Sequence, residues 1–338
     1  MNDVKEKYEL IEKLGSGNFG TVYKVRNNIL DRIEALKIVE GVSPKDYEKQ
    51  LEAKVQHKLQ HKNIVEIYDA YVRNNKLYIS MEYLNGGTLE SRAKSEHVTV
   101  KEVVRYLIDC LYGLQHIHNN GYIHRDLKPN NILMNNNTIK LSDFGLADLM
   151  DEDKELKSDF GYTFHRAPEV FTRKAYCEQS DIYALGVTAF RLLNGDNHIK
   201  GNQNLKESIL NGTFPPRDKF HYRKDVPKKL VDIINKALDV NLTNRYSSAH
   251  HFRHALKAVT IPIDWVLITN RDNKQVWLGG NGVSKYKLEV TRKILSEKYN
   301  IEVYKGNSSF RKITKYCSSD IPVKKIDTQV RKLLTMDL

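Results

Sequence analysis

Cysteine is scarce in this sequence, with 3 residues in 338, at positions 110, 177 and 317. Their wide separation excludes the paired spacing of a zinc site and the dense pattern of a small disulfide-stabilised domain. Long apolar runs are also missing, since no stretch approaches the roughly 18 to 20 residues that span a membrane. The start, Met-Asn-Asp-Val-Lys-Glu-Lys, lacks the apolar segment of a signal peptide. We therefore expect a cytoplasmic protein in a reducing compartment, without a membrane partner.

The composition is typical of a globular protein with a buried core, because hydrophobic residues make up 40% of the chain and charged residues 28%. The length of 338 residues favours two domains. The formal net charge is +12, and residues 261–338 hold 15 Lys and Arg against 8 Asp and Glu. This positive charge favours acidic partners, such as nucleic acid, anionic membrane or protein surfaces, and ATP.

Four short motifs follow one another along the chain, and each contains residue types that phosphoryl transfer needs. They are Gly-Ser-Gly-Asn-Phe-Gly-Thr-Val at 15–22, His-Arg-Asp-Leu-Lys-Pro-Asn-Asn at 124–131, Asp-Phe-Gly at 143–145 and Ala-Pro-Glu at 167–169. Any one of them could arise by chance, but the complete set in this order predicts an enzyme that moves the terminal phosphoryl group of ATP.

The glycine-rich motif is expected to form a hairpin over phosphate groups. Glycines let backbone amides approach phosphate oxygens without a Cβ in the way. A dinucleotide-binding turn uses the same Gly-x-Gly-x-x-Gly string, but there the string opens a helix. Here it lies between two predicted strands, Tyr8 to Leu14 and Thr21 to Val25, and the second strand is β-branched and alternating. The sequence therefore favours the hairpin.

On these motifs the chain resembles the eukaryotic-type (Hanks-type) serine/threonine protein kinases, over roughly residues 5 to 258. The resemblance implies an α+β protein with a bilobal kinase domain at 1–258. Its β-rich small lobe would lie at about 1–84 and its mainly helical large lobe at about 85–258. The resemblance also implies transfer of the γ-phosphoryl group of Mg-ATP to hydroxyl groups of protein substrates.

The resemblance assigns ATP binding to the small lobe. Lys37 would contact the α- and β-phosphates, held by a carboxylate from a helix expected at Asp46 to Leu59. Glu52 is preferred over Glu48 for this carboxylate, because the apolar face of the helix places it suitably. Thr88 stands where many relatives have an acidic ribose contact, so that contact is not carried over. Met81 would be the gatekeeper, and Glu82 and Leu84 would contribute backbone groups. The implied nucleotide-binding residues are Leu14, Gly15, Ser16, Gly17, Asn18, Phe19, Gly20, Val22, Ala35, Lys37, Met81, Glu82 and Leu84.

The resemblance assigns catalysis to the large lobe. Asp126 would orient the substrate hydroxyl and accept its proton, and Lys128 would lie near the γ-phosphate. Lysine two residues after the aspartate is the serine/threonine-type variant. Asn131, the fifth residue after Asp126, and Asp143 would bind the Mg²⁺ that bridges the phosphates.

Residues 146–166 match the activation segment, and Arg125 matches the arginine that pairs with a phosphate on this segment in related kinases. We expect phosphorylation of Ser158 or Thr163, with autophosphorylation as one route, to act as a switch. In the alternative, acidic residues of the segment supply the charge and the enzyme is always active. These residues are Asp151, Glu152, Asp153, Glu155 and Asp159.

Around Ala-Pro-Glu the resemblance implies structural roles and also shows a departure. Tyr162 and His165 occupy the positions where the family commonly has threonine and tyrosine, so peptide preference is not carried over. Glu169 is expected to pair with a buried arginine, Arg245. Asp181 is expected to brace the backbone of the catalytic loop as a cap rather than a reactant.

The remaining large-lobe patterns are a helix expected at 100–119, with apolar residues at helical spacing, and a hairpin expected at 132–142. His250 and His254 share one face of a further helix, at a spacing that suits a metal ion. No acidic or cysteine cluster accompanies them, so a solvated helix face is the favoured interpretation.

Residues 261–338 resemble no extension that we can name, and they predict a small basic α+β domain. Basic residues and aromatic residues interleave here, as in domains that bind nucleic acid, but protein docking and a purely stabilising role stay open. The expected elements are a hairpin at 265–269 and 275–278, a helix at 284–299 with Tyr286, Val290, Ile294 and Leu295 on one face, strands at 301–304 and 310–316, and a helix at 327–334 capped by Asp327.

Two other functions compete with that of an active serine/threonine protein kinase. In one, the kinase lobes only sense ATP, as in a pseudokinase, and the basic C-terminal part binds a protein or nucleic acid. In the other, the substrate is a small molecule. The Ala-Pro-Glu motif and its expected partner Arg245 disfavour the small-molecule kinase, because they belong to the arrangement of kinases that act on peptides.

Overall fold

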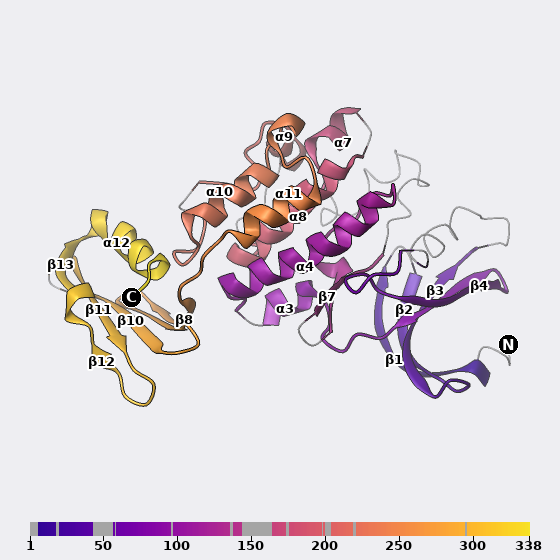
Figure 1. The fold of residues 1–338 in the computed structure, drawn as a ribbon, viewed down its shortest axis with the longest axis horizontal. Coiled ribbons are helices and arrows are strands. Elements are labelled where there is room, and N and C mark those ends of the chain that lie inside the picture. The colour runs from indigo at the N-terminus through magenta and orange to yellow at the C-terminus, as the bar shows by residue number, and fades with distance from the viewer. Residues whose placement is uncertain are drawn as a thin grey trace.

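A computed structural model of the chain describes residues 6–17, 20–42, 57, 59–95, 97–135, 138–143, 164–173, 176–197, 199, 204–218, 221–294 and 296–338. Three regions follow one another in Figure 1: a sheet at the N-terminal end, a helical middle and a second sheet at the C-terminal end. The first two are the expected small and large lobes.

The small lobe is a five-stranded antiparallel sheet with strand order β1-β2-β3-β5-β4. Both of its faces carry apolar residues, with Val25 and Leu36 in one cluster and Val39 and Ile79 in another. The two predicted strands beside the glycine-rich motif are confirmed. The strands are β1 (Tyr8–Gly17), β2 (Gly20–Asn27), β3 (Arg32–Glu40), β4 (Ile67–Arg73) and β5 (Lys76–Glu82).

The large lobe is built around α4 and α8, which contribute more buried residues to its core than its other elements do. The predicted helix and hairpin are confirmed as α4 and as the pair β6 and β7. No helix in the described ranges has the length and apolar character needed to cross a membrane. The elements are α3 (Leu89–Ser95), α4 (Val100–Asn119), η1 (Pro129–Asn131), β6 (Ile132–Asn135), β7 (Thr138–Leu141), α7 (Pro168–Arg173), α8 (Glu178–Asn194), α9 (Leu205–Leu210), α10 (Lys228–Ala237), η3 (Leu242–Asn244) and α11 (Ala249–Lys257).

Helix α4 begins at Val100 because Thr99 and Glu102 form a capping box. The Thr99 hydroxyl accepts a hydrogen bond from the Glu102 amide at 3.2 Å, and the Glu102 carboxylate accepts one from the Thr99 amide at 2.9 Å. The two side chains satisfy backbone donors that the first turn of a helix leaves free. The C-terminal end of α4 then leads into the catalytic loop.

The C-terminal region folds as a second sheet, in the order β12-β11-β10-β9-β8, with β13 also paired to β11. Helix α12 packs on one face of this sheet, and both tryptophans of the chain, Trp265 and Trp277, are buried in the core between them. The elements are β8 (Asp264–Arg271), β9 (Lys274–Gly280), β10 (Lys285–Arg292), β11 (Lys298–Lys305), β12 (Arg311–Lys312), η4 (Thr314–Tyr316), β13 (Ser318–Pro322) and α12 (Val323–Thr335).

The predicted helix at 284–299 is wrong, because this segment forms β10 and the start of β11. Tyr286 and Val290 satisfy a helical spacing, but Leu288 between them is equally buried. Burial of every second residue fits the two-residue period of a strand. Ile294, predicted to lie on the apolar face of the helix, is 88% exposed in a turn.

The other predictions for this region fare better. The hairpin of β8 and β9 and the strand at 301–304 are confirmed. The strand at 310–316 is found only in part, as β12 followed by η4. The last helix exists but begins at Val323, so Asp327 lies inside it and is not its cap. Leu295 lies outside the described residues.

The C-terminal region contacts the large lobe at the end away from the small lobe (Figure 1). Asp264 of β8 accepts hydrogen bonds from the Thr99 hydroxyl at 2.9 Å and from the Lys101 amide at 3.3 Å. Arg331 of α12 donates to the carbonyl oxygens of Tyr222 and Arg223 at 3.0 and 3.2 Å. Side chains of β8 and α12 therefore hold the first turn of α4 and a loop of the large lobe.

Candidate active site

The glycine-rich motif forms the tip of the β1–β2 hairpin, as predicted. Gly15 pairs with Val22 and Gly17 with Gly20. A Cβ built on Gly15 or Gly17 meets no atom within 4 Å, so both leave open space beside their backbone. Gly20 has a positive φ of 112°, and a Cβ there would lie 2.4 Å from the Ile38 carbonyl oxygen. The third glycine is therefore required for β2 to pass close to β3.

One face of the small-lobe sheet brings the predicted nucleotide residues together. Val22 lies opposite Lys37 in the β2–β3 pair, and Ala35 lies opposite Met81 in the β3–β5 pair. Directly opposed residues share a face, and so do residues two apart in one strand. Val22, Ala35, Lys37 and Met81 therefore line the same face, below the glycine-rich hairpin.

Lys37 joins the small lobe to the Asp-Phe-Gly motif. Its Nζ lies 2.6 Å from Oδ1 of Asp143, and the lysine residue is only 4% exposed. Burial alone would raise the pKa of the Asp143 carboxyl, but the Lys37 ammonium outweighs it and holds that pKa below its ordinary value, with smaller help from Lys128 and His124. The Asp143 carboxylate is therefore ionised at neutral pH.

The catalytic-loop motif places three predicted residues in contact. Lys128 Nζ lies 2.7 Å from Oδ2 of Asp126, and Asn131 Nδ2 donates to the same oxygen at 2.7 Å. Asn131 also donates to the Asp126 backbone carbonyl at 2.9 Å. These hydrogen bonds fix the orientation of the carboxylate. Asp126 is thereby held in one position at the end of the loop.

Asp181, at the start of α8, braces the backbone just before Asp126, as predicted. Its carboxylate accepts hydrogen bonds from the amides of His124 at 2.9 Å and Arg125 at 2.8 Å. Arg125 has a φ of 68°, a left-handed conformation that is unfavourable for a residue with a side chain. The buried carboxylate stabilises this conformation. Sequence reasoning missed that His118 also contacts Asp181, with 2.9 Å between Nε2 and Oδ2.

Backbone hydrogen bonds bring Asn131 and Asp143 into one site. The amide of Ser142 donates to the Asn131 carbonyl at 2.9 Å, so the residue before Asp143 is fixed to the other predicted metal ligand. The chain after β5 is held to the same hairpin, because the Gly86 amide donates to the Met134 carbonyl at 3.0 Å. A Cβ on Gly86 would lie 2.6 Å from that carbonyl oxygen. Sequence reasoning missed this link, although two consecutive glycines pointed to a close approach.

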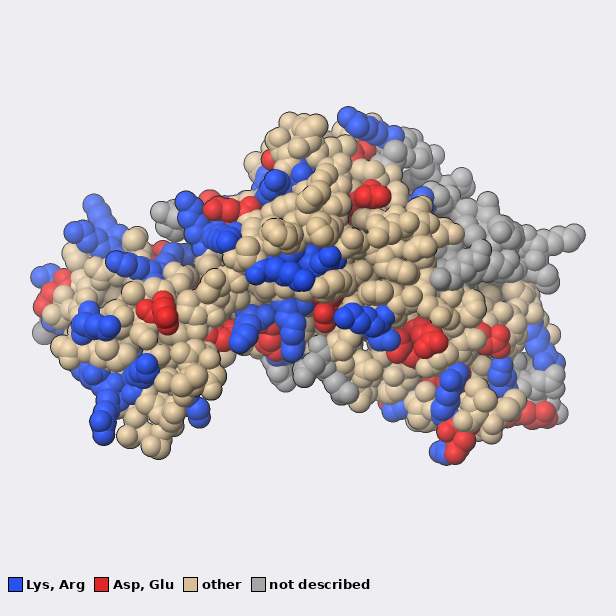
Figure 2. Space-filling view, in the orientation of Figure 1, with Lys and Arg blue, Asp and Glu red and all other residues tan. Residues whose placement is uncertain are grey.

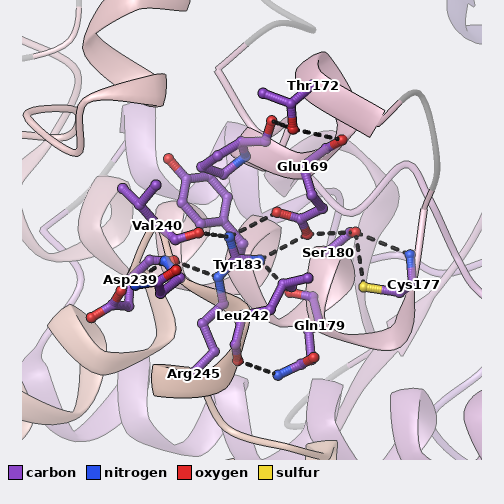
Figure 3. Close-up of polar contacts among 12 residues, drawn as sticks. Glu169, Thr172, Cys177, Gln179, Ser180, Tyr183, Asp239, Val240, Leu242 and Arg245 are labelled. Atoms are coloured by element: carbon purple, nitrogen blue, oxygen red, sulfur yellow. Dashed lines mark hydrogen bonds and ion pairs between the residues drawn. The ribbon is translucent and has the colours of Figure 1, made fainter.

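The predicted pair of Glu169 and Arg245 is present and buried (Figure 3). Two hydrogen bonds of 2.8 Å join the guanidinium to the two carboxylate oxygens, and Ser180 Oγ donates to Glu169 at 2.7 Å. Arg245 further donates to the Gln179 carbonyl at 3.1 Å. The pair fixes Ala-Pro-Glu to α8, the helix that also carries Asp181.

Some predicted residues lie outside the described residues, namely Asn18, Phe19, Glu48, Glu52 and all of 144–163 with Ser158, Tyr162 and Thr163. His165 is described and buried, with 7% of its surface exposed. Burial, together with the charges of Arg191 and Lys128, holds the pKa of its ring well below the usual value, so the ring is neutral. Leu14 is 43% exposed at the hairpin, whereas Leu84 is buried where the chain leaves β5.

The residues that the structure brings together fit Mg²⁺ and nucleotide phosphates. Both bonds from the Asn131 side chain to Asp126 use Nδ2, which leaves its amide oxygen as a possible ligand beside the ionised Asp143. One carboxylate and one amide oxygen, completed by phosphate oxygens, are the hard ligands that Mg²⁺ prefers. Lys37 and the open glycine backbone suit the phosphates themselves.

The histidines of α11 lie on an exposed helix face. In the described parts of the chain, no group of three or more His, Cys, Asp or Glu residues could hold a metal ion. His250 and His254 are exposed on α11.

Comparison with known proteins agrees with this geometry. A family model described as "Protein kinase domain" matches residues 8–256, and no family model matches the region after it. A probable myosin light chain kinase of Dictyostelium discoideum is 30% identical over 308 residues, which cover 88% of this chain and 94% of that protein. Serine/threonine-protein kinase sid1 of Schizosaccharomyces pombe is 29% identical over 289 residues, covering 79% of this chain and 58% of that protein. Serine/threonine-protein kinase pakA of Talaromyces marneffei is 30% identical over 268 residues, with 78% and 41% covered.

Proposed function

The chain belongs to the protein kinase family and is a serine/threonine kinase, and we propose that it transfers the γ-phosphoryl group of Mg-ATP to hydroxyl groups of proteins with the residues of its interlobe site. The observation that carries the proposal is the ion pair of 2.6 Å between Lys37 and Asp143, residues 106 positions apart. It joins the phosphate-binding lysine of one lobe to the metal-binding motif of the other.

Each residue of the site then has one role in the transfer. Asp126, fixed by Lys128 and Asn131, orients the attacking hydroxyl and accepts its proton. Lys37 binds the α- and β-phosphates, and Lys128 lies where the γ-phosphoryl group passes. Asp143 and Asn131 would hold Mg²⁺, which supplies charge neutralisation at the phosphates. The chain itself therefore contributes positioning, electrostatic stabilisation and one proton acceptor.

Transfer of label from γ-labelled ATP tests this proposal, with the protein itself and a generic protein as acceptors. We expect labelled phosphoserine or phosphothreonine, lost in the Lys37→Ala variant. Absence of transfer in the wild type, while ATP still binds with Mg²⁺, would contradict the proposal and favour the ATP-sensing scaffold. Labelled small metabolites without labelled protein would favour the small-molecule kinase.

We further propose that Ser158 or Thr163 is an autophosphorylation site that switches activity. Support comes from Arg125, whose backbone Asp181 holds beside the catalytic aspartate. Mass spectrometry of protein incubated with Mg-ATP, with Asp126→Asn as the inactive control, would identify the site. An unmodified segment in fully active wild-type protein would contradict the switch.

Residues 261–338 are proposed to act as a separate domain that recruits an acidic protein or a nucleic acid. Their own buried core and the exposed residues Lys324, Lys325 and Lys332 on α12 support this role. Binding of the full chain to an oligonucleotide and to an acidic protein, each at two salt concentrations, would test it. Loss of salt-dependent binding when the three lysines become glutamine is the expected result. Retained binding would contradict this role.

Free thiols at all three cysteines and the use of ATP support the proposed cytoplasmic location.

A further inference from the structure

Three cationic side chains surround one tyrosine on the surface of the large lobe. Tyr112 of α4 accepts a hydrogen bond at its hydroxyl oxygen from Lys257 Nζ at 2.7 Å. The guanidinium carbon of Arg253 lies 4.1 Å from the centroid of the tyrosine ring, and Lys62 Nζ lies 5.3 Å from it. The cations come from α11 and from the loop before β4, so they converge from two directions.

None of these three cations forms a salt bridge with a carboxylate of the described residues. Arg253 instead donates to the side-chain oxygen of Gln115 at 2.5 Å and lies 3.3 Å from Nδ1 of His250. The nearest acid on α4, Asp109, is half-buried and accepts a hydrogen bond from the Ile139 amide at 3.3 Å. Burial raises the pKa of the Asp109 carboxyl, and the charge of Lys62 acts against this shift, so Asp109 compensates part of that charge. Arg253 and Lys257 form no ion pair with a carboxylate of the described residues.

The ionisation of Tyr112 agrees with a positive local potential. The hydrogen bond from Lys257 lowers the pKa of the Tyr112 hydroxyl and outweighs the opposing effect of burial. The charges of Lys257, Arg253 and Lys62 lower it further. Because these cations stabilise the anionic form of Tyr112, they would also stabilise an external anion bound beside it.

We propose that Lys62, Arg253 and Lys257, together with the Tyr112 hydroxyl, bind a phosphate monoester group. A phosphate dianion accepts several charge-assisted hydrogen bonds at once, which matches three cations and one hydroxyl donor better than a single carboxylate does. Arg253 and Lys257 lie one helical turn apart and project from the same side of α11. Lys62 and Lys257 are exposed, so a ligand reaches them from solvent.

The site is separate from the interlobe cleft. Figure 1 draws α4 and α11 side by side on the face of the large lobe toward the viewer, and Figure 2 shows Lys and Arg side chains gathered over the middle of this face. The phosphate ester can belong to a phosphorylated side chain of a protein or to a small phosphorylated compound. In the first case the cluster would anchor a phosphorylated segment away from Asp126.

Nuclear magnetic resonance of the full chain tests the site directly. Inorganic phosphate, O-phosphoserine and a phosphoserine peptide would each be titrated at constant ionic strength, with chloride as the reference anion. Shifts of the α4 and α11 amides report this cluster separately from the nucleotide cleft, which also binds phosphate. We expect saturable shifts with phosphate and none with chloride. Tighter binding of the peptide than of O-phosphoserine assigns the ester to a protein segment, and equal binding assigns it to a small compound.

Substitutions give the second arm of the test. Lys257→Gln and Lys62→Gln each remove one exposed charge, and we expect each to weaken phosphate binding about tenfold, with the amide spectrum otherwise unchanged. The matched control is Lys228→Gln, an exposed lysine of α10 that removes the same charge and is expected to leave phosphate binding at this cluster unchanged. Equal weakening by the control, or unchanged binding in both cluster variants, would overturn the proposal.

Discussion

The large lobe and the C-terminal region use charged residues in different ways. In the large lobe, the side chains of Glu169 and Arg245 are 6% and 0% exposed and meet through two short hydrogen bonds. In the C-terminal region, Arg292 and Glu297 are 40% and 77% exposed and meet at 3.1 Å. Buried charges must be fully paired, whereas exposed pairs are screened by water and contribute little.

The buried charges around α8 position the catalytic loop, whereas the charges of the second sheet have no such role. Glu169 and Arg245 are buried and bond to each other, and Asp181 is buried and accepts from backbone amides of the catalytic loop, so removal of any one leaves its own partners unpaired. On the second sheet, Glu289 and Glu302 lie directly opposite each other and are neutralised by neighbouring lysines. Those groups are 17% and 38% exposed, and we expect them to be replaceable because the core beneath them holds the strands together.

The largest expected effect separates catalysis from stability. Asp126→Asn removes the proton acceptor but retains the shape of the side chain, so we expect kcat to fall about 10²- to 10⁴-fold. The melting temperature should change little. Asn130→Ala, an exposed neighbour outside the proposed machinery, is the control and should retain activity within about twofold. A steady-state assay with labelled ATP measures both, and comparable losses in the two variants would refute the role of Asp126.

The contrast between buried and exposed pairs predicts the next largest effect. Arg245→Ala leaves the Glu169 carboxylate buried without its partner, which should cost about 3 to 5 kcal/mol in the free energy of unfolding. Arg292→Ala breaks an exposed pair and should cost less than about 1 kcal/mol. Guanidinium unfolding followed by far-ultraviolet circular dichroism compares them. Similar midpoints for the two variants would show that the contrast is wrong.

The sequence predicted most of the kinase lobes because their functional residues occur in motifs of fixed spacing. The Gly15–Val22 hairpin and the contacts of Asp181 and Glu169 follow from such motifs, and all are found. Helix α4 follows from its apolar periodicity and is also found. His118 was not predicted, because a histidine inside a helix carries no local signal of a partner 63 residues later. Contacts of this kind depend on the packing of α4 against α8.

The C-terminal region had no motif, so its prediction depended on periodicity alone. Tyr286 and Val290 fit both a helix and a strand, and only the alternate position Leu288 separates the two. Pairing of β10 with β9 and β11 decided the outcome, and such long-range pairing is not visible in a short stretch of sequence. Of the aromatic residues there, Trp265 and Trp277 are buried in the core, whereas Phe310 is 39% exposed.

A smaller effect is expected where the two regions meet. Asp264→Ala removes the acceptor of the Thr99 hydroxyl and the Lys101 amide, which should cost about 1 kcal/mol. Because burial raises the pKa of the Asp264 carboxyl, Asp264→Asn retains an acceptor without the buried charge and should lose less. Both tryptophans lie in the C-terminal region, so their fluorescence reports its unfolding. Equal losses in the two variants would contradict this role of Asp264.

The smallest effect is the change in stability at acid pH where the C-terminal region meets the large lobe. Burial alone would raise the pKa of the Asp327 carboxyl, but its ion pair with Arg331 at 2.7 Å, assisted by Lys224, lowers that pKa below the ordinary value. The pair therefore contributes stability that is complete above the unfolded pKa of about 3.9 and is lost as the pH falls through the lower folded value.

This pH dependence is measurable as a difference between two proteins. Asp327→Asn cannot ionise, so between about pH 5 and pH 3 its fluorescence-detected unfolding midpoint should fall less steeply than that of the wild type. The loss in the wild type should be modest, because Asp327 is 34% exposed and the pair is screened by water. Parallel pH profiles would mean that the Arg331 contacts with the carbonyl oxygens of Tyr222 and Arg223 hold the C-terminal region without help from Asp327.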